Sequence, residues 1–149
     1  MSIEQEVELL RRVPMFANVA NANLKLLAFA SQRLSFNEGD VIFEQGADGD
    51  AAYIIIGGTA NVEIDSVTGP VTVATLEENQ IVGEIAILCD VPRTATVRAA
   101  TELTTLRVTK DLFFKLSVEF PQMAVEVMKK IGNHLESTTG HLGEAMAAN

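Results

Sequence analysis

The stretch from Gly83 to Val97 holds residue types that can bind an anion. Gly83 precedes Glu84 and a short apolar run that favours one or two helical turns, and Pro92 then leads into Arg93. The first turn of a helix has backbone N–H groups without partners and attracts anions. Glycine lets a ligand approach the backbone closely, and a planar guanidinium matches phosphate oxygens. The order of these residues therefore predicts a phosphate site.

Glu84 needs a further explanation, because a carboxylate is repelled by a phosphate. A carboxylate accepts hydrogen bonds and cannot donate, so its natural partner is a hydroxyl of the same ligand, such as a ribose 2′-OH. The alternative is that Glu84 and Arg93 form an ordinary structural ion pair. Between Arg33 and Arg93 the chain has many acidic residues and no Lys or Arg. An anionic ligand would need one cation there, which favours a nucleotide site.

These residues resemble the phosphate-binding cassette of the cyclic nucleotide-binding domain family. That family includes catabolite-activator-type bacterial regulators, cyclic-nucleotide-dependent protein kinases and cyclic-nucleotide-gated channels. Its pattern is approximately Phe-Gly-Glu-Leu-Ala-Leu-Leu, a short spacer and Pro-Arg-x-Ala-x-Val. The matching segments are Val82–Leu88 and Pro92–Val97, and the phrases Gly39–Gly46 and Tyr53–Gly58 also match, so the resemblance covers nearly the whole chain. Val replaces the aromatic residue of the family at the first position of the cassette.

The resemblance implies a role for each cassette residue. Glu84 would bind the ribose 2′-OH and Arg93 the exocyclic phosphate oxygens. The backbone amides of Ile85, Ala86 and Ala95 would bind the remaining oxygens. The ligand implied is therefore a cyclic nucleotide, cAMP or cGMP.

The choice of base depends on residues outside these phosphate contacts. A hydroxyl after the arginine, here Thr94, is compatible with guanine recognition in this family and does not exclude adenine. Val71, Val73 and Ala74 are candidates for a wall against the base, with core packing as an equal alternative. The expected ligand-binding residues are Val73, Val82, Gly83, Glu84, Ile85, Ala86, Arg93, Thr94 and Ala95.

The composition fits one cytoplasmic domain. The chain has 149 residues, a net charge of −9 and an isoelectric point near 4.6. This acidity argues against a DNA-binding or anionic membrane surface, which would need clustered Lys and Arg. Cys89 is the only cysteine, so no intrachain disulfide can form, and we expect it to be a small buried residue. No apolar run reaches the ~20 residues of a membrane span, and the first residues are acidic where a signal peptide would be basic.

The helical lead-in over residues 1–30 predicts two helices. Ser2 caps a helix that runs to Arg12, and Asn21 or Asn23 caps a second helix after an apolar turn. The residues expected on the buried faces are Ile3, Val7 and Leu10 in the first helix and Leu24, Leu27 and Ala28 in the second.

Residues 31–109 contain short β-like runs separated by turn residues. Polar and apolar residues alternate from Asn61 to Asp65, which is typical of a half-buried strand. About eight short strands and a small helix in the cassette, residues 82–97, predict an α+β, mainly β fold. It is an antiparallel β jelly-roll barrel with N-terminal helices and C-terminal lid helices. The runs are Val41–Phe43, Ala52–Ile56, Ala60–Ile64, Val71–Leu76, Thr94–Ala99 and Leu103–Val108.

Residues 110–149 predict C-terminal helices, first Asp111–Glu119 and then a helix from Pro121 towards His141. Apolar positions in the second follow coiled-coil spacing, which allows a weak homodimer, but three glycines favour packing on the chain's own barrel. The resemblance implies that this helix is a lid over the base, with Leu135, His134 or His141 as its cap. The spaced positions are Met128, Ile131, Leu135, Thr138, Leu142 and Ala145.

The sequence therefore predicts a free-standing cyclic nucleotide receptor, which is a binding module and not an enzyme. The ligand would reposition the C-terminal helices and so signal to a separate effector protein, since no DNA-binding or channel segment is expected beyond residues 1–149. The alternative is a degenerate domain that binds a partner protein with an empty cassette. A cupin-like metalloenzyme needs barrel histidines, whereas His134 and His141 lie in the C-terminal region. The Asp48–Asp50 segment lacks the spacing of a calcium loop and is expected to be a turn.

Overall fold

A computed structural model describes residues 2–121, 125 and 128–129 of the chain. Its helices are α1 (Ile3–Arg11), the 3₁₀ helix η1 (Pro14–Phe16), α2 (Asn21–Ala30), α3 (Glu84–Cys89) and α4 (Lys110–Glu119). Its strands are β1 (Gln32–Phe36), β2 (Val41–Phe43), β3 (Ala51–Gly57), β4 (Ala60–Ser66), β5 (Gly69–Leu76), β6 (Ile81–Val82), β7 (Thr96–Ala99) and β8 (Leu103–Thr109).

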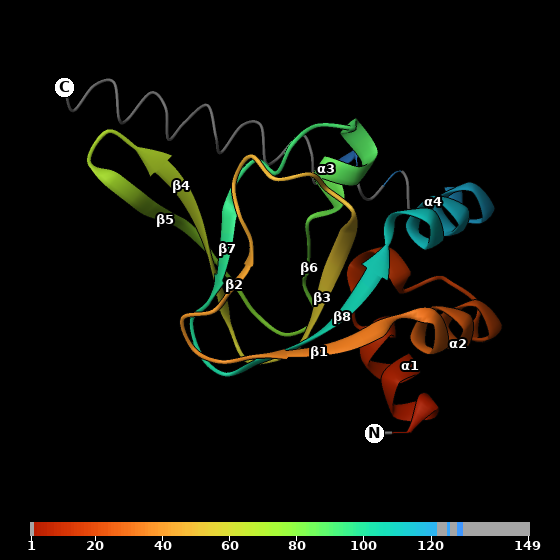
Figure 1. Cartoon of the computed structure of the whole chain (residues 1–149). Coiled ribbons are helices and arrows are strands. Elements are labelled where there is room, and N and C mark those ends of the chain that lie inside the picture. Colours follow the sequence, from red (N-terminus) through yellow and green to blue (C-terminus); the bar gives the residue numbers. More distant parts are fainter. Residues whose placement is uncertain (1, 122–124, 126–127, 130–149) are drawn as a thin grey trace.

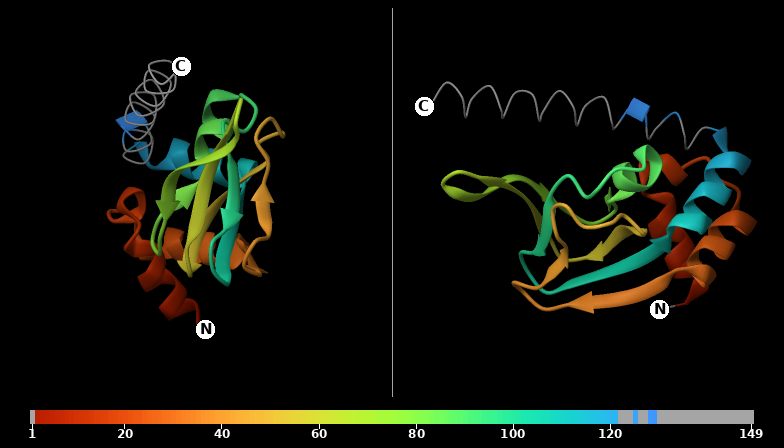
Figure 2. Two further views of the ribbon diagram at one scale, coloured as in Figure 1. Left: turned by 90° about the vertical axis from the view of Figure 1, so that its left-hand side faces the viewer. Right: turned by 45° about the horizontal axis from the view of Figure 1, so that its top comes forward.

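The strands form two four-stranded antiparallel sheets, in the orders β1-β8-β3-β6 and β2-β7-β4-β5. Helices α1, α2 and α4 gather at one end of this roll, and the β4–β5 hairpin extends from the other (Figure 1). Two further views show the same arrangement (Figure 2). The predicted fold is confirmed as a mainly β, jelly-roll-like arrangement, although the described strands leave the two sheets open and do not close one continuous barrel.

The start of α1 follows from local sequence signals. The Ser2 side chain accepts a hydrogen bond from the Gln5 backbone N–H, and the Gln5 side chain accepts one from the Ser2 N–H, which confirms the predicted cap. The predicted Asn cap of α2 is wrong. That helix begins at Asn21 with Ala20 at the N-cap position, so neither Asn occupies the cap, and the Asn21 side chain accepts a hydrogen bond from Arg11.

The core has two parts, separated by the sheet that contains β3. All the residues from Ala51 to Ile56 are buried, because β3 is covered on both faces. Ile54 belongs to the cluster that packs under the helices, and Ile55 belongs to the cluster inside the roll. Of the residues predicted to be buried in α1 and α2, Val7, Leu10, Leu24, Leu27 and Ala28 are buried and Ile3 is half-buried.

Some local predictions differ from the structure. Strand β1 is mostly polar and β6 has only two residues, so neither was among the predicted runs. In β4 the residues Asn61–Ile64 are all half-buried and do not alternate cleanly, since Glu63 is partly covered by its ion pair with Arg98. Cys89 is exposed, contrary to the prediction, because it lies in the last, outward-facing turn of α3.

The predicted lid and seam fall largely outside the described residues. This applies to the candidate caps His134, Leu135 and His141, whereas Met128 is described and exposed. Within the described part of the chain, no helix combines the length and the apolar character needed to cross a membrane.

Phe113 attaches α4 to the core, since its side chain is 0% exposed and belongs to the cluster that contains Leu10 and Leu106. We expect Phe113→Ala to lower the free energy of unfolding by about 3–5 kcal/mol in urea, because the substitution leaves a cavity. The adjacent Phe114 is 38% exposed, and Phe114→Ala should cost less than about 1 kcal/mol. Equal losses in the two variants would contradict this account of how α4 is anchored.

Candidate functional site

The backbone turns at Gly83, between β6 and α3, with a φ of 93° in the left-handed region. A Cβ at this position would lie 2.6 Å from Nη1 of Arg93 and 3.2 Å from the carbonyl oxygen of Ala51. The sequence predicted that this glycine admits a ligand close to the backbone. In the structure the group that it admits is the guanidinium of Arg93.

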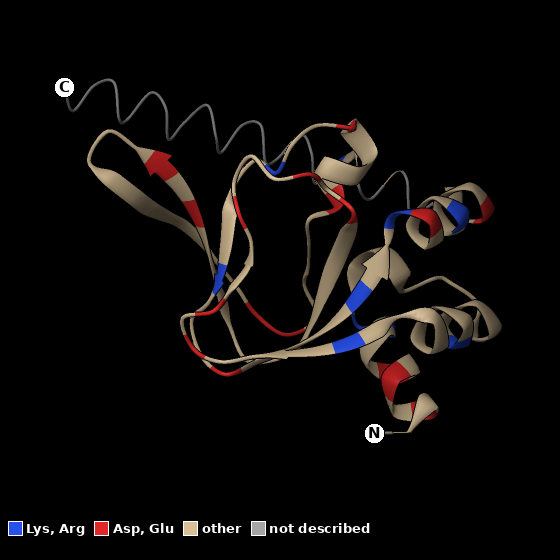
Figure 3. Cartoon of the chain, in the orientation of Figure 1, with Lys and Arg blue, Asp and Glu red and all other residues tan. Residues whose placement is uncertain are grey.

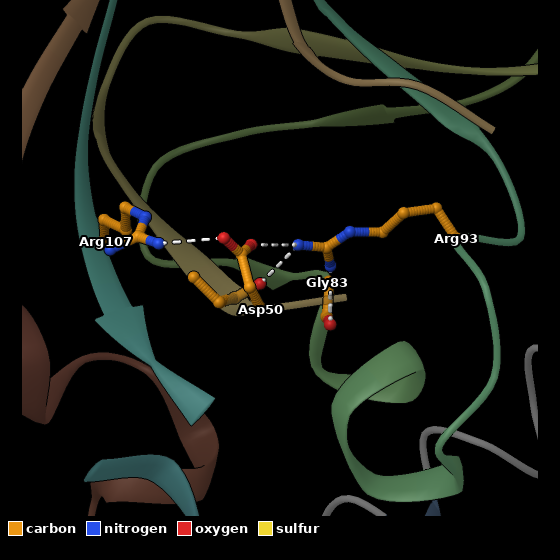
Figure 4. Close-up of polar contacts among 5 residues, drawn as sticks. Asp50, Gly83, Arg93 and Arg107 are labelled. Carbon is orange, nitrogen blue, oxygen red and sulfur yellow. Dashed lines mark hydrogen bonds and ion pairs between the residues drawn. The ribbon is translucent and has the colours of Figure 1, made fainter. Parts of the chain in front are cut away.

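Arg93 is 3% exposed and is held by neutral backbone groups. Its Nη1 donates to the Gly83 carbonyl at 2.9 Å, and its Nη2 donates to the Ala51 carbonyl at 2.7 Å (Figure 4). The guanidinium carbon lies 4.0 Å from the centre of the Phe43 ring, which is a cation–π distance. These contacts fix the orientation of the arginine.

Asp50 contributes a negative charge close to this guanidinium. Its Oδ1 lies 3.6 Å from Arg93 Nη2, and its Oδ2 lies 3.1 Å from Arg107 Nη2 (Figure 4). The preceding Gly49 packs tightly on α3, since a Cβ there would lie 2.5 Å from the Cβ of Ala86. The Asp48–Asp50 segment is therefore part of the site, whereas the sequence indicated only a turn.

Arg93 and Glu84 are both buried, and their charges interact. Glu84, the first residue of α3, is 1% exposed. Burial lowers the pKa of Arg93 from its usual value, and Tyr53, Asp50 and Glu84 oppose this shift through their charges. An arginine remains charged at neutral pH despite such a shift. The head of α3 therefore presents a fixed positive charge beside a buried carboxyl group.

The other expected ligand residues differ in exposure. Val73 lies on the edge strand β5, where the pairing with β4 is irregular, and its place in a wall for the base stays a prediction. Val73, Val82 and Ile85 are half-buried, Ala86 and Ala95 are buried, and Thr94 is exposed.

Residues that the sequence analysis missed come from distant segments. Phe43, Asp50 and Ala51 contact Arg93, and Arg107 contacts Asp50, through strand pairing and loop packing. The signal available in the sequence was Asp50 directly after Gly49, but Asp40 likewise follows Gly39, and the same pattern occurs in many surface turns.

Acidic and basic residues are distributed unevenly over the fold (Figure 3). Acidic residues lie along the loops and strand ends of the roll, whereas most basic residues lie on the helices and on β1, β7 and β8 (Figure 3).

Among the described residues, His, Cys, Asp and Glu side chains form no group of three or more that could hold a metal ion.

Comparison with protein families places most of the roll and α4 in one known domain type. The model of the cyclic nucleotide-binding domain matches residues 33–119. The cAMP-dependent protein kinase regulatory subunit of Yarrowia lipolytica is 35% identical over 107 residues, which are 72% of this chain and 28% of that protein. The chain therefore spans less than a third of the length of this relative.

Solved structures share the fold. A cyclic nucleotide-binding-like protein from Brucella abortus is 29% identical, with a TM-score of 0.66, and the match covers 74% of this chain and 96% of that one. The regulatory domain of Toxoplasma gondii PKA, crystallised with cAMP, has a TM-score of 0.79 at 21% identity, and the match covers 87% of this chain and 50% of that one.

Gly83 and Gly39 provide a matched test of the arginine contact. Their φ angles are 93° and 91°, but a Cβ at Gly39 would meet nothing within 4 Å. We expect Gly39→Ala to cost about 1–2 kcal/mol of unfolding free energy, because alanine is strained in this backbone region. Gly83→Ala should cost about 1–3 kcal/mol more, because it also displaces the packed Arg93. Equal losses in urea unfolding would show that Arg93 moves aside without cost.

Proposed function

The chain belongs to the cyclic nucleotide-binding domain family, and from this membership we propose that it is a receptor module for a cyclic purine nucleotide, cAMP or cGMP. The observation that carries the proposal is the buried, oriented guanidinium of Arg93 at the head of α3. A cyclic nucleotide carries one phosphate charge and one free ribose hydroxyl. Arg93 and Glu84 offer groups of matching chemistry to these two features.

The donors of Arg93 support the phosphate assignment. Hydrogen bonds from Nη1 and Nη2 reach backbone carbonyls, whereas Nε is buried and has no hydrogen-bond partner among the described residues. A buried donor without a partner costs about 1–3 kcal/mol. A phosphate oxygen at this position would remove that cost. In this proposal Glu84 accepts from the ribose 2′-OH, and the amides of Ile85, Ala86 and Ala95 bind the remaining phosphate oxygens.

The cassette is connected to α4, which supports a regulatory role. Ile87 of α3 lies in the same buried cluster as Phe113 and Leu116 of α4. The first residue of α4, Lys110, also donates its backbone N–H to the Asp50 carbonyl at 3.0 Å. A ligand that moves α3 would thereby favour one position of α4 and of the residues that follow it. We propose that these helices signal to an effector protein or to a second copy of the chain, in the cytoplasm.

One observation favours the alternative of a partner-binding domain with an empty cassette. Arg93 is covered and has polar partners, as expected of an arginine with a purely structural role. The two functions differ in one measurable respect, since only the receptor binds a nucleotide.

Calorimetric titration with cAMP and cGMP, on protein purified free of bound nucleotide, tests the proposal. Wild type should bind at least one of them saturably. Arg93→Ala should weaken binding by about 2–5 kcal/mol, since it removes a charged partner in a buried site. Glu84→Ala should cost less, about 1–3 kcal/mol, because it removes one hydrogen bond.

The control for this titration is Arg98→Ala, which removes an equal charge from β7. Arg98 forms an ion pair with Glu63 at 3.4 Å, and its loss should change the binding free energy by less than about 1 kcal/mol. If folded wild type binds neither nucleotide, the receptor proposal fails and the partner-binding alternative stands.

Thr94 tests the choice of base separately, because its side chain is exposed next to Arg93. We expect Thr94→Ala to weaken cGMP binding by about 0.5–1.5 kcal/mol, the contribution of one hydrogen bond, and to change cAMP binding less. The same calorimetric titration measures both ligands. An equal loss for the two nucleotides would rule out guanine recognition by the hydroxyl.

A further inference from the structure

A second arginine competes for the carboxylate that pairs with Arg93. Arg107 Nη2 donates to Asp50 Oδ2 at 3.1 Å, and Arg93 Nη2 lies 3.6 Å from Asp50 Oδ1. The side chain of Arg93 is 2% exposed, that of Arg107 is 25% exposed and that of Asp50 is 69% exposed. One largely exposed carboxylate therefore lies between two guanidinium groups and makes its shorter contact with Arg107 (Figure 4).

The strand register places Arg107 on the same side of its sheet as the cassette. Arg107 of β8 is directly opposite Tyr53 of β3, and opposite residues in paired strands point to the same face. The ring of Tyr53 lies 5.9 Å from that of Phe43, which stacks under Arg93. By contrast Leu106, the preceding residue of β8, belongs to the cluster under the helices. The side chain of Arg107 therefore lies on the inner face of its sheet, as that of Tyr53 does.

We propose that Arg107 is a positioning residue that sets how strongly the cassette binds an anionic ligand, and this inference rests on the proposed function. An Asp50 carboxylate that paired with Arg93 alone would cancel much of the positive potential that a phosphate needs. Because Arg107 holds the same carboxylate at the shorter distance, that cancellation is reduced. Arg107 acts through Asp50 and not by contact with the nucleotide.

A simple surface ion pair between Asp50 and Arg107 would have a different consequence. Such a pair contributes little to stability and would not affect ligand binding. The two roles are separated by a double-mutant cycle, which measures whether the effect of one residue depends on the other.

The experiment is calorimetric titration of wild type, Arg107→Ala, Asp50→Asn and the double variant with whichever of cAMP and cGMP binds wild type. We expect Arg107→Ala to weaken binding by about three- to tenfold, because Asp50 then pairs with Arg93 alone. In the Asp50→Asn background the same substitution should change affinity by less than about twofold, because the carboxylate charge is gone. Arg107→Lys, which keeps the charge, should restore most of the affinity.

Arg33→Ala is the matched control for the loss of one positive charge. Arg33 lies on the neighbouring strand β1 and pairs with Glu6 at 3.2 Å, away from Asp50. Its substitution should leave nucleotide affinity unchanged. Unchanged binding in Arg107→Ala, an equal loss in the Asp50→Asn background, or an equal loss in Arg33→Ala overturns the inference while the receptor function stands. Absence of binding by wild type overturns both.

Discussion

Burial of the Arg93 charge is the constraint on which the site depends. Moving a guanidinium out of water is unfavourable by several kcal/mol unless polar partners replace the lost solvent. The partners here are the carbonyls of Gly83 and Ala51 and the carboxylate of Asp50. Each of these partners belongs to another segment of the chain, and that segment must hold its oxygen in place. The chain needs a glycine at position 83, a fixed start for β3 and an acidic residue in the loop before it.

Strand β3 connects this constraint to the rest of the molecule. The backbone at its start receives Arg93 at the Ala51 carbonyl and the first N–H of α4 at the Asp50 carbonyl. Further along, alternate side chains of β3 enter the cluster under the helices and the cluster inside the roll, as Ile54 and Ile55 do. The segment that positions the candidate phosphate site therefore also positions the helical end of the domain.

The sequence predicts those elements whose signals are local. The Ser2 cap of α1, the short helix after Gly83 and the helix before Phe120 each depend on neighbouring residues, and the structure contains all three. Strand β1 was missed because it is polar, and its existence depends on pairing with β8, more than sixty residues away. The contact of Asp50 with two arginines is equally non-local, since it exists only after β3 and β8 have paired.

Orienting an arginine and neutralising its charge are separate effects, and the contacts of Arg93 divide between them. Carbonyl groups are neutral, so the bonds from Arg93 to Gly83 and Ala51 fix its direction without cancelling its charge. Asp50 does carry charge, but its contact with Arg93 is 3.6 Å, longer than an ordinary hydrogen bond. The neutral carbonyls therefore fix the direction of the arginine, whereas Asp50 and Glu84 stabilise its charge. A bidentate carboxylate at ordinary hydrogen-bond distance would combine the two effects and leave less positive potential at the guanidinium.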